Sequence, residues 1–386
     1  MSYRALARTV SPGFFALGFL GRLPYAMAPL ATLVLLVDAT GSYTFAGLAS
    51  AAQSIAIAVA GPAVGALADR FGHRLVGVVT AVGNAFALVG LVVAAGMDRP
   101  AMLLAATLAG LLQPQVGPLV RVQWRRLLGS DPLMQAALSY EAAADEIAFV
   151  AGPAAVGLLA PLGPAVPAVV MAAMLVVASL PFALFFATRE PNRQAPTGPR
   201  PALPRWPMIA LFLAMAAMGA ILGAIQTGVT AYATSAAGLL YAELGIGSAL
   251  AGVACGWLPA TFGWWRRYVV FAATLLAGMT TLAAGVPVPI AIAVAGVTVA
   301  PYMISLYALT DHIAPPSRAA VAMTILCAGG PLGSAVGRAV AGRLADTYGS
   351  VGAFAVAPAA AGLALALAVV VVVRRARQEK AQNRLR

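Results

Sequence analysis

Residues 65–75 read GALADRFGHRL, a short charged segment that lies between two long apolar runs. Hydrophobic residues make up 61% of the 386 positions, whereas soluble domains contain about 45–50% apolar residues. The flanking runs, near residues 43–66 and 75–96, are long enough to cross a hydrocarbon core, which takes about 20 residues. The sequence therefore predicts that residues 65–75 form a loop between two helices of an all-α membrane protein.

Similar apolar stretches recur along the whole chain, and turn-forming residues such as Asp38, Gly41 and Pro132 separate them. We predict twelve transmembrane helices. They lie near residues 11–37, 43–66, 75–96, 101–121, 133–160, 164–187, 208–233, 239–262, 268–285, 288–309, 318–341 and 351–373.

The longest polar stretch, TREPNRQAPTGPRPALPRWP, covers residues 188–207 and contains six prolines. Such a segment cannot span a membrane, so we predict a cytoplasmic linker over residues 189–207. The linker separates an N-terminal six-helix half, residues 1–188, from a C-terminal six-helix half with a short basic tail, residues 208–386.

The basic residues indicate how the chain is oriented. With the N-terminus inside, 20 of the 24 lysines and arginines fall on the inner side; the exceptions are Arg22, Arg99, Arg338 and Arg343. The positive-inside rule then places both termini in the cytoplasm. The abundance of arginine, alanine and glycine favours a GC-rich bacterial genome, and hence a multi-pass protein of the bacterial inner membrane. Because topology distributes the charge of +12, we expect no binding of nucleic acid.

The loop at residues 65–75 resembles the signature loop of the major facilitator superfamily, which has the pattern G-x-L-a-D-r-x-G-r-[KR]. The matching positions are Gly65, Leu67, Asp69, Arg70, Gly72 and Arg74. The resemblance implies a fold of two six-helix halves and the function of a secondary transporter. It also implies that this loop is a conformational latch. Asp69 would face the start of span eleven, where Ser317 is a candidate helix cap.

Two further segments carry the resemblance. Residues 256–267, GWLPATFGWWRR, look like a decayed copy of the loop, and AGPAAVG at 151–157 resembles GGPLGSAVG at 329–337. Such internal repetition is typical of transporters built from two halves. Within the superfamily the chain looks most like bacterial drug/proton and arabinose-efflux permeases. Gly152, Pro153 and Gly157 are similar to the antiporter motif of span five, although its double glycine is incomplete.

Efflux members often carry an arginine inside span four, in a pattern like R-x-x-Q-G. Here Gln115 and Gly117 match the end of that pattern, but the arginine position near Leu111 is apolar. Arg121 falls at the cytoplasmic end of the predicted span. The usual arginine is therefore missing or displaced.

Three carboxylates interrupt the apolar span five, at Glu141, Asp145 and Glu146. Charged groups at membrane depth cost several kcal/mol and are usually functional. Glu141 and Asp145 share a helix face, so their mutual repulsion favours a proton on one of them. The family fold places spans one and five side by side, and Arg22 of span one lies at a similar depth. We therefore expect a central ion-pair network of Arg22, Glu141, Asp145 and Glu146 with an acidic excess.

The network suggests a proton antiporter that exports a small amphiphilic or cationic compound. A proton-coupled importer shares these features, and the carboxylates could also serve only to hold helices together. An intramembrane enzyme is a remote alternative, because no metal triad or nucleophile with a base can be assembled from two histidines. We expect a monomer in the lipid bilayer whose partners are the substrate and protons, with neither a cofactor nor a metal.

Other polar side chains at membrane depth are weaker candidates for the substrate cavity. They are Asn84, Gln113, Gln115, Gln226, Tyr232 and Tyr302. For each of them, hydrogen bonding between helices is at least as plausible as contact with a substrate.

Overall fold

The computed structural model describes residues 6, 8–128, 133–187, 203–255, 258, 262–315 and 319–384. The chain forms two compact units, and each is described by itself. The first consists of residues 1–196 with 234–239, and the second of residues 197–233 with 240–386. Every regular element in the described ranges is a helix, as the sequence predicts.

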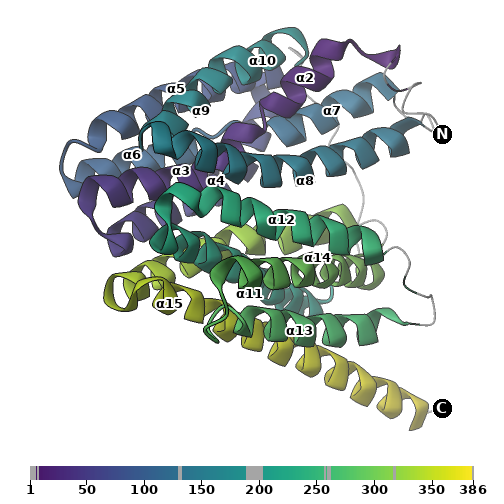
Figure 1. The fold of residues 1–386 in the computed structure, drawn as a ribbon. Helices are drawn as coiled ribbons and strands as arrows, with labels where there is room; N and C mark the ends of the chain where they lie inside the picture. The colour runs from purple at the N-terminus through teal and green to yellow at the C-terminus, as the bar shows by residue number, and fades with distance from the viewer. Residues whose placement is uncertain are drawn as a thin grey trace. The chain divides into compact units, whose positions relative to one another are not determined.

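The first unit contains helices from purple to teal in Figure 1. They are α2 (Pro12–Leu20), α3 (Leu23–Thr40), α4 (Tyr43–Phe71), α5 (His73–Ala94), α6 (Arg99–Leu111), α7 (Val116–Leu128), α8 (Leu133–Leu159), η1 (Ala160–Leu162), α9 (Val166–Met174), η2 (Leu175–Ser179), α10 (Leu180–Phe185) and η3 (Thr234–Ala236). Helix α3 is enclosed by its neighbours, and Leu30, Leu33 and Leu36 form the centre of the core with Leu88 of α5.

The second unit is drawn from green to yellow in Figure 1. Its helices are α11 (Arg205–Tyr232), α12 (Ala237–Ala254, of which the first three residues belong to the first unit), α13 (Trp264–Thr280), α14 (Val288–Ile313) and α15 (Ala319–Arg384). Helix α15 turns back on itself at Gly349, whose φ of 64° and ψ of −154° are readily adopted only by glycine. Spans eleven and twelve are therefore the two arms of α15.

Nine helices in the described ranges are long and apolar enough to cross a membrane by length and composition. One of them, Ile325–Arg375, holds both arms of α15. Helix α13 has only 17 residues, and α8 contains the shorter apolar stretch that ends in η1, Ile147–Leu162. The second arm of α15, helix α13 and helix α8 add three segments to these nine, so a helical segment lies at each of the twelve predicted spans.

Three of the spans are not the continuous helices that we expected. Span one is divided between α2 and α3, span four between α6 and α7, and span six contains a π-helical turn, η2. A proline lies at each interruption: Pro24 is the second residue of α3, Pro114 lies in the gap of span four, and Pro181 is the second residue of α10, directly after η2. Proline lacks the amide hydrogen that a helix needs and also disfavours helical geometry in the residue before it.

The repeated glycine segments pack in the same way in the two units. In the first unit, a side chain at Gly152 of α8 would collide with Ala26 of α3. In the second unit, Gly333 and Gly337 of α15 lie against the backbone of Ala216 and Ala220 of α11. Each segment therefore allows close contact with the first long helix of its own unit, as small residues do at helix interfaces in membranes.

Candidate functional site

Arg22 lies at the junction between α2 and α3, where the helical hydrogen bonding changes. Because Tyr25 N–H donates to the Arg22 carbonyl at 3.1 Å, the Gly21 carbonyl lacks its usual helical partner. The hydroxyl of Ser179, from the π-helical turn η2, donates to that Gly21 carbonyl at 3.3 Å. This hydrogen bond joins the π-helical turn to the junction between α2 and α3. It thereby helps to fix the backbone from which Arg22 extends.

Helix α8 presents Glu141 and Asp145 to this arginine from successive turns. Nη2 of Arg22 forms an ion pair with Glu141, and its Nη1 lies 3.3 Å from Oδ1 of Asp145. The same Nη1 lies 3.5 Å from the backbone carbonyl of Glu141. The expected association of these three side chains is therefore present in the structure.

Helix α7 adds two residues that we did not assign to this network from the sequence. Arg121 forms an ion pair with the second oxygen of Asp145, and the indole Nε1 of Trp124 donates to Oε1 of Glu141 at 2.9 Å. The two side chains are three positions apart and so share one face of α7. Each carboxylate oxygen of Glu141 and Asp145 therefore has a partner, which is either Arg22 or a side chain of α7.

The two carboxylates differ in their access to solvent. The side chain of Glu141 is 1% exposed and that of Arg22 is 5% exposed, whereas Asp145 is 30% exposed and Arg121 is 41% exposed. Removing one member of a buried ion pair is strongly destabilising, while exposed pairs contribute little. Glu141 thus belongs to the enclosed part of the network, and Asp145 lies at its exposed edge.

Arg121 adds a second cation to the network that we expected, and the acidic excess of the whole network stays a prediction. Among the described side chains, the network contains Arg22 and Arg121 against Glu141 and Asp145, so its charges balance. Glu146 has its side chain outside the described residues. The interruption at residues 112–115 places Arg121 inside α7, and not at the end of one long helix.

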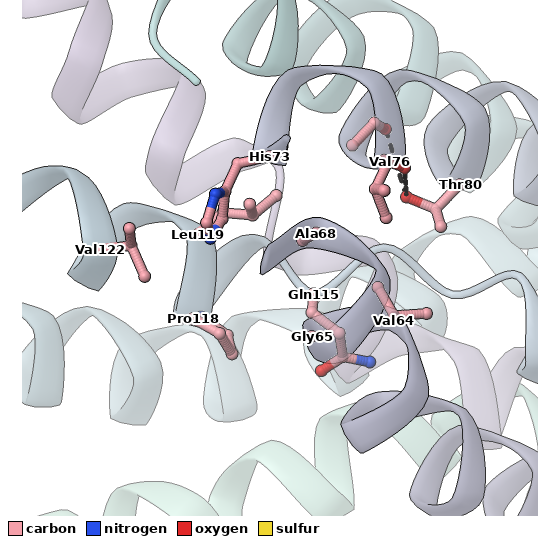
Figure 2. Close-up of a pocket in the computed structure, with 11 residues that line it drawn as sticks. Val64, Gly65, Ala68, His73, Val76, Thr80, Gln115, Pro118, Leu119 and Val122 are labelled. Carbon is pink, nitrogen blue, oxygen red and sulfur yellow. Dashed lines mark hydrogen bonds between the residues drawn. The ribbon is translucent and has the colours of Figure 1, made fainter. Parts of the chain in front are cut away.

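Next to the interruption of span four lies a cavity of about 170 Å³. Figure 2 shows its wall, which includes Gly65 from α4, His73 and Thr80 from α5, and Gln115 from the gap. The Thr80 hydroxyl donates back to the carbonyls of Val76 and Gly77 on its own helix. The cavity is mainly apolar, and it joins the signature loop to span four.

The remaining cavity candidates of the first unit are side-chain amides, of which Asn84 and Gln113 are buried. Asn84 donates to the backbone carbonyl of Ala109 on α6 and so connects two helices. Gln113 is buried, and neither of its amide atoms has a hydrogen-bond partner in the described structure. Gln115 lies 3.4 Å from the carbonyl of Gln113 and faces the cavity.

The candidates of the second unit lie in different surroundings. The hydroxyl of Tyr302 lies 3.4 Å from the Ala214 carbonyl, and its ring stacks on Tyr268 with centroids 5.9 Å apart. Tyr232 is exposed on the unit that contains it. Gln226 is buried, and its Oε1 accepts a hydrogen bond from Arg338 at 3.0 Å.

Arg338 is a buried cation that sequence reasoning missed. Its side chain is 1% exposed and also donates to the hydroxyl of Ser334 at 2.6 Å. The sequence carried a signal, because Arg338 was one of four basic residues that did not fit the inner side. An intramembrane arginine is a functional candidate by default.

We expected residues 65–75, the signature loop, to lie between two helices, but most of them are helical. Only Gly72 lies outside a helix, because α4 ends at Phe71 and α5 begins at His73. Gly72 has φ 93° and ψ 139°, a conformation that side chains strongly disfavour. Arg70 is exposed and lies over the ring of Phe71 at 5.2 Å, and Arg74 is half-buried. The expected contact of Asp69 with the start of span eleven involves a side chain and residues 316–318 that lie outside the described residues.

The antiporter-like segment allows close packing at two points. Besides the contact of Gly152 with α3, a side chain at Gly157 would collide with the backbone of Gly238, which belongs to the same unit. Pro153 lies inside α8 between them. In the part of the chain that the structure describes, no cluster of His, Cys, Asp and Glu could hold a metal ion.

Comparison with known proteins identifies the family. The model described as "Major Facilitator Superfamily" matches residues 14–288 and, in a second match, residues 207–386. The structure is similar to that of the nucleoside transporter NupG, with a TM-score of 0.71 and 18% identity over 93% of this chain and 97% of that one. It also resembles the POT family transporter PepTSo (TM-score 0.69, 13% identity, 96% and 98% covered).

A bacterial homologue of the iron transporter ferroportin has the same fold, with a TM-score of 0.69 and 15% identity over 93% of this chain and 98% of that one. At these identities the likeness is one of fold. No curated protein matches the chain by sequence.

Proposed function

This chain belongs to the Major Facilitator Superfamily and is a membrane transporter, not an enzyme, and we propose that it exports a small molecule in exchange for protons. The observation that carries the proposal is the unequal solvent access of two carboxylates held by the same arginine. Glu141 is enclosed and receives hydrogen bonds from Arg22 and Trp124, whereas Asp145 is 30% exposed.

Asp145 is the proton-carrying residue in this proposal, and Glu141 holds Arg22 in place. A proton carrier must meet water during the cycle, and the greater exposure of Asp145 supports this role for it rather than for Glu141. Its partner Arg121 is also the more exposed of the two arginines, so their ion pair can open at low cost. Opening the pair of Arg22 and Glu141 would instead leave a buried charge without a partner.

Protonation of Asp145 changes the charge of the network. When Asp145 is ionised, two arginines balance two carboxylates; when it is protonated, the network carries one positive charge and Arg121 loses its partner. A ligand shifts a conformational equilibrium only by binding the two states differently. The proton does so here, because the contacts between α7 and α8 depend on whether Asp145 is charged.

The direction of transport and the substrate class are inferred from the same features. The antiporter-like segment around Gly152 and Pro153 favours export. Carboxylates at membrane depth favour a substrate without negative charge, so we propose a small amphiphilic or cationic compound. The distribution of arginines supports both termini in the cytoplasm and a location in a bacterial inner membrane.

Substrate-induced proton movement tests the proposal. Purified protein is reconstituted in liposomes that enclose a pH-sensitive dye, and a panel of amphiphilic compounds is added outside. An antiporter should release protons from the lumen in exchange for an active compound, whereas Asp145→Asn should not. Proton entry together with the compound would instead indicate an importer. Proton flux that is unaffected by Asp145→Asn would contradict the proposed site.

A further inference from the structure

A groove lies on the second unit where the start of α13 meets the end of α15. Its walls are formed by Phe262, Trp265, Arg266, Val269, Val270 and Val372, and its volume is about 290 Å³. Val270 is exposed, and the surfaces that line the groove are apolar. Figure 1 shows α13 and the yellow arm of α15 side by side. Helix α13 begins here at Trp264, and the apolar part of α15 ends here at Val373, so we place the groove at one membrane boundary.

Arginine side chains surround this groove. The guanidinium of Arg375 lies over the ring of Trp265, with 4.2 Å between its central carbon and the ring centroid. Arg374 lies over Trp206 at the same distance. Arg266 is exposed and contributes to the groove itself. Positive charge and indole rings therefore meet at the end of an apolar groove.

Apolar walls next to arginine and tryptophan side chains complement a molecule that has both an acyl chain and an anionic headgroup. An acyl chain matches apolar walls at membrane depth, and a phosphodiester matches arginine through charge-assisted hydrogen bonds. Basic pockets between transmembrane helices on the cytoplasmic side bind anionic lipid headgroups, and tryptophan is enriched at the same boundary. A soluble anion would use the arginines but would leave the apolar walls exposed to lipid.

We propose that this groove is a binding site for an anionic glycerophospholipid. One acyl chain lies against Trp265, Val269 and Val372, and the phosphate lies between Arg266 and Arg375. The site is independent of the carboxylate network, because every residue in it belongs to the second unit. It gives this transporter a preference for an anionic inner leaflet.

Quenching of tryptophan fluorescence by brominated lipids tests the site. The protein is reconstituted in phosphatidylcholine vesicles that contain equal fractions of either dibrominated phosphatidylglycerol or dibrominated phosphatidylcholine. Subtracting the signal of Trp265→Phe isolates the residue that lines the groove. Each arginine near a headgroup corresponds to about fivefold enrichment of an anionic lipid. With each brominated lipid titrated over the same series of fractions, we therefore expect half-maximal quenching of Trp265 at a several-fold lower fraction of phosphatidylglycerol than of phosphatidylcholine.

Variants distinguish the contribution of the arginine charges to lipid binding from that of the apolar groove. Arg266→Gln and Arg375→Gln should each reduce the preference for phosphatidylglycerol by about fivefold, whereas Arg343→Gln, at an exposed arginine outside the groove, should not. Val269→Phe should fill the groove and reduce quenching by both lipids. Equal quenching of the wild-type protein by the two lipids would overturn the proposal. So would protection of Trp265 by soluble glycerol phosphate, which would show that the arginines bind a free anion.

Discussion

The indole Nε1 of Trp124 lies 2.9 Å from Oε1 of Glu141, inside a cluster of aromatic rings that includes Phe14 and Tyr140. The rings of Phe14 and Trp124 meet edge to face with centroids 4.8 Å apart. The indole therefore cannot turn away from the carboxylate without disturbing this cluster. This contact makes Glu141 a fixed acceptor for Arg22, and it leaves Asp145 as the carboxylate that can change its partners.

Trp124→Phe keeps the ring but removes the donor. We expect it to lower the free energy of unfolding by about 1.5–3 kcal/mol, the contribution of a hydrogen bond to a charged group. Coupling to protons should persist, because Asp145 is untouched. Thermal unfolding and proton flux measure the two effects, with Trp206→Phe as a control at an exposed indole. Loss of coupling at normal stability would mean that Trp124 acts on the proton carrier directly.

A double-mutant cycle tests the buried ion pair. Arg22→Ala should destabilise the protein by about 3–5 kcal/mol, because it leaves Glu141 buried without its cation. Adding Glu141→Gln to Arg22→Ala should recover part of that loss, since the amide carries no charge to be compensated. Unfolding of the two single variants and the double variant gives the coupling energy. Strictly additive effects would show that the two side chains do not interact energetically.

The turn at Gly72 can be tested by a matched pair of alanine substitutions. Gly72→Ala should cost about 1–3 kcal/mol, because φ of 93° is strained for any residue with a Cβ. Gly65→Ala in the same loop motif should be tolerated, since Gly65 is helical and no atom lies within 4 Å of the added carbon. Thermal unfolding distinguishes them. Equal tolerance of both would mean that the loop relaxes freely.

Reporter fusions test the orientation that the arginines predict. Fusions after Asp98 and Leu162 should report the outside, and fusions near Pro196 and after Arg374 should report the cytoplasm. A phosphatase active only outside and a fluorescent protein active only inside provide opposite readouts at each position. An external fusion at Pro196 would contradict the twelve-span orientation.

The sequence predicts much of this fold because its signals are local. Twelve apolar stretches define the spans, and the glycine segments around Pro153 and Pro331 predict equivalent packing in the two units. The association of Arg22 with Glu141 and Asp145 followed from the arrangement of spans in the family that the signature loop indicates. These inferences needed only depth, periodicity and a known order of helices.

Arg121 and Trp124 could not be assigned in this way. Treating residues 101–121 as one straight helix places Arg121 at the membrane surface, whereas the gap at residues 112–115 shifts its position. Two glutamines flank Pro114 in that gap, and this was the signal that could have predicted the interruption. The contact of Arg338 with Gln226 depends on how α11 packs against α15, which no local pattern specifies.

The most direct test of the central claim compares Asp145→Asn with the wild-type protein in proteoliposomes, using an active compound from the panel. Two fluxes are measured: transport driven by a pH gradient, and exchange of the compound between equal concentrations without a gradient. We predict that Asp145→Asn abolishes the first and retains much of the second, because the amide keeps the shape of the site but cannot release a proton. Transport that still follows the pH gradient in the Glu141→Gln/Asp145→Asn double variant would contradict the account.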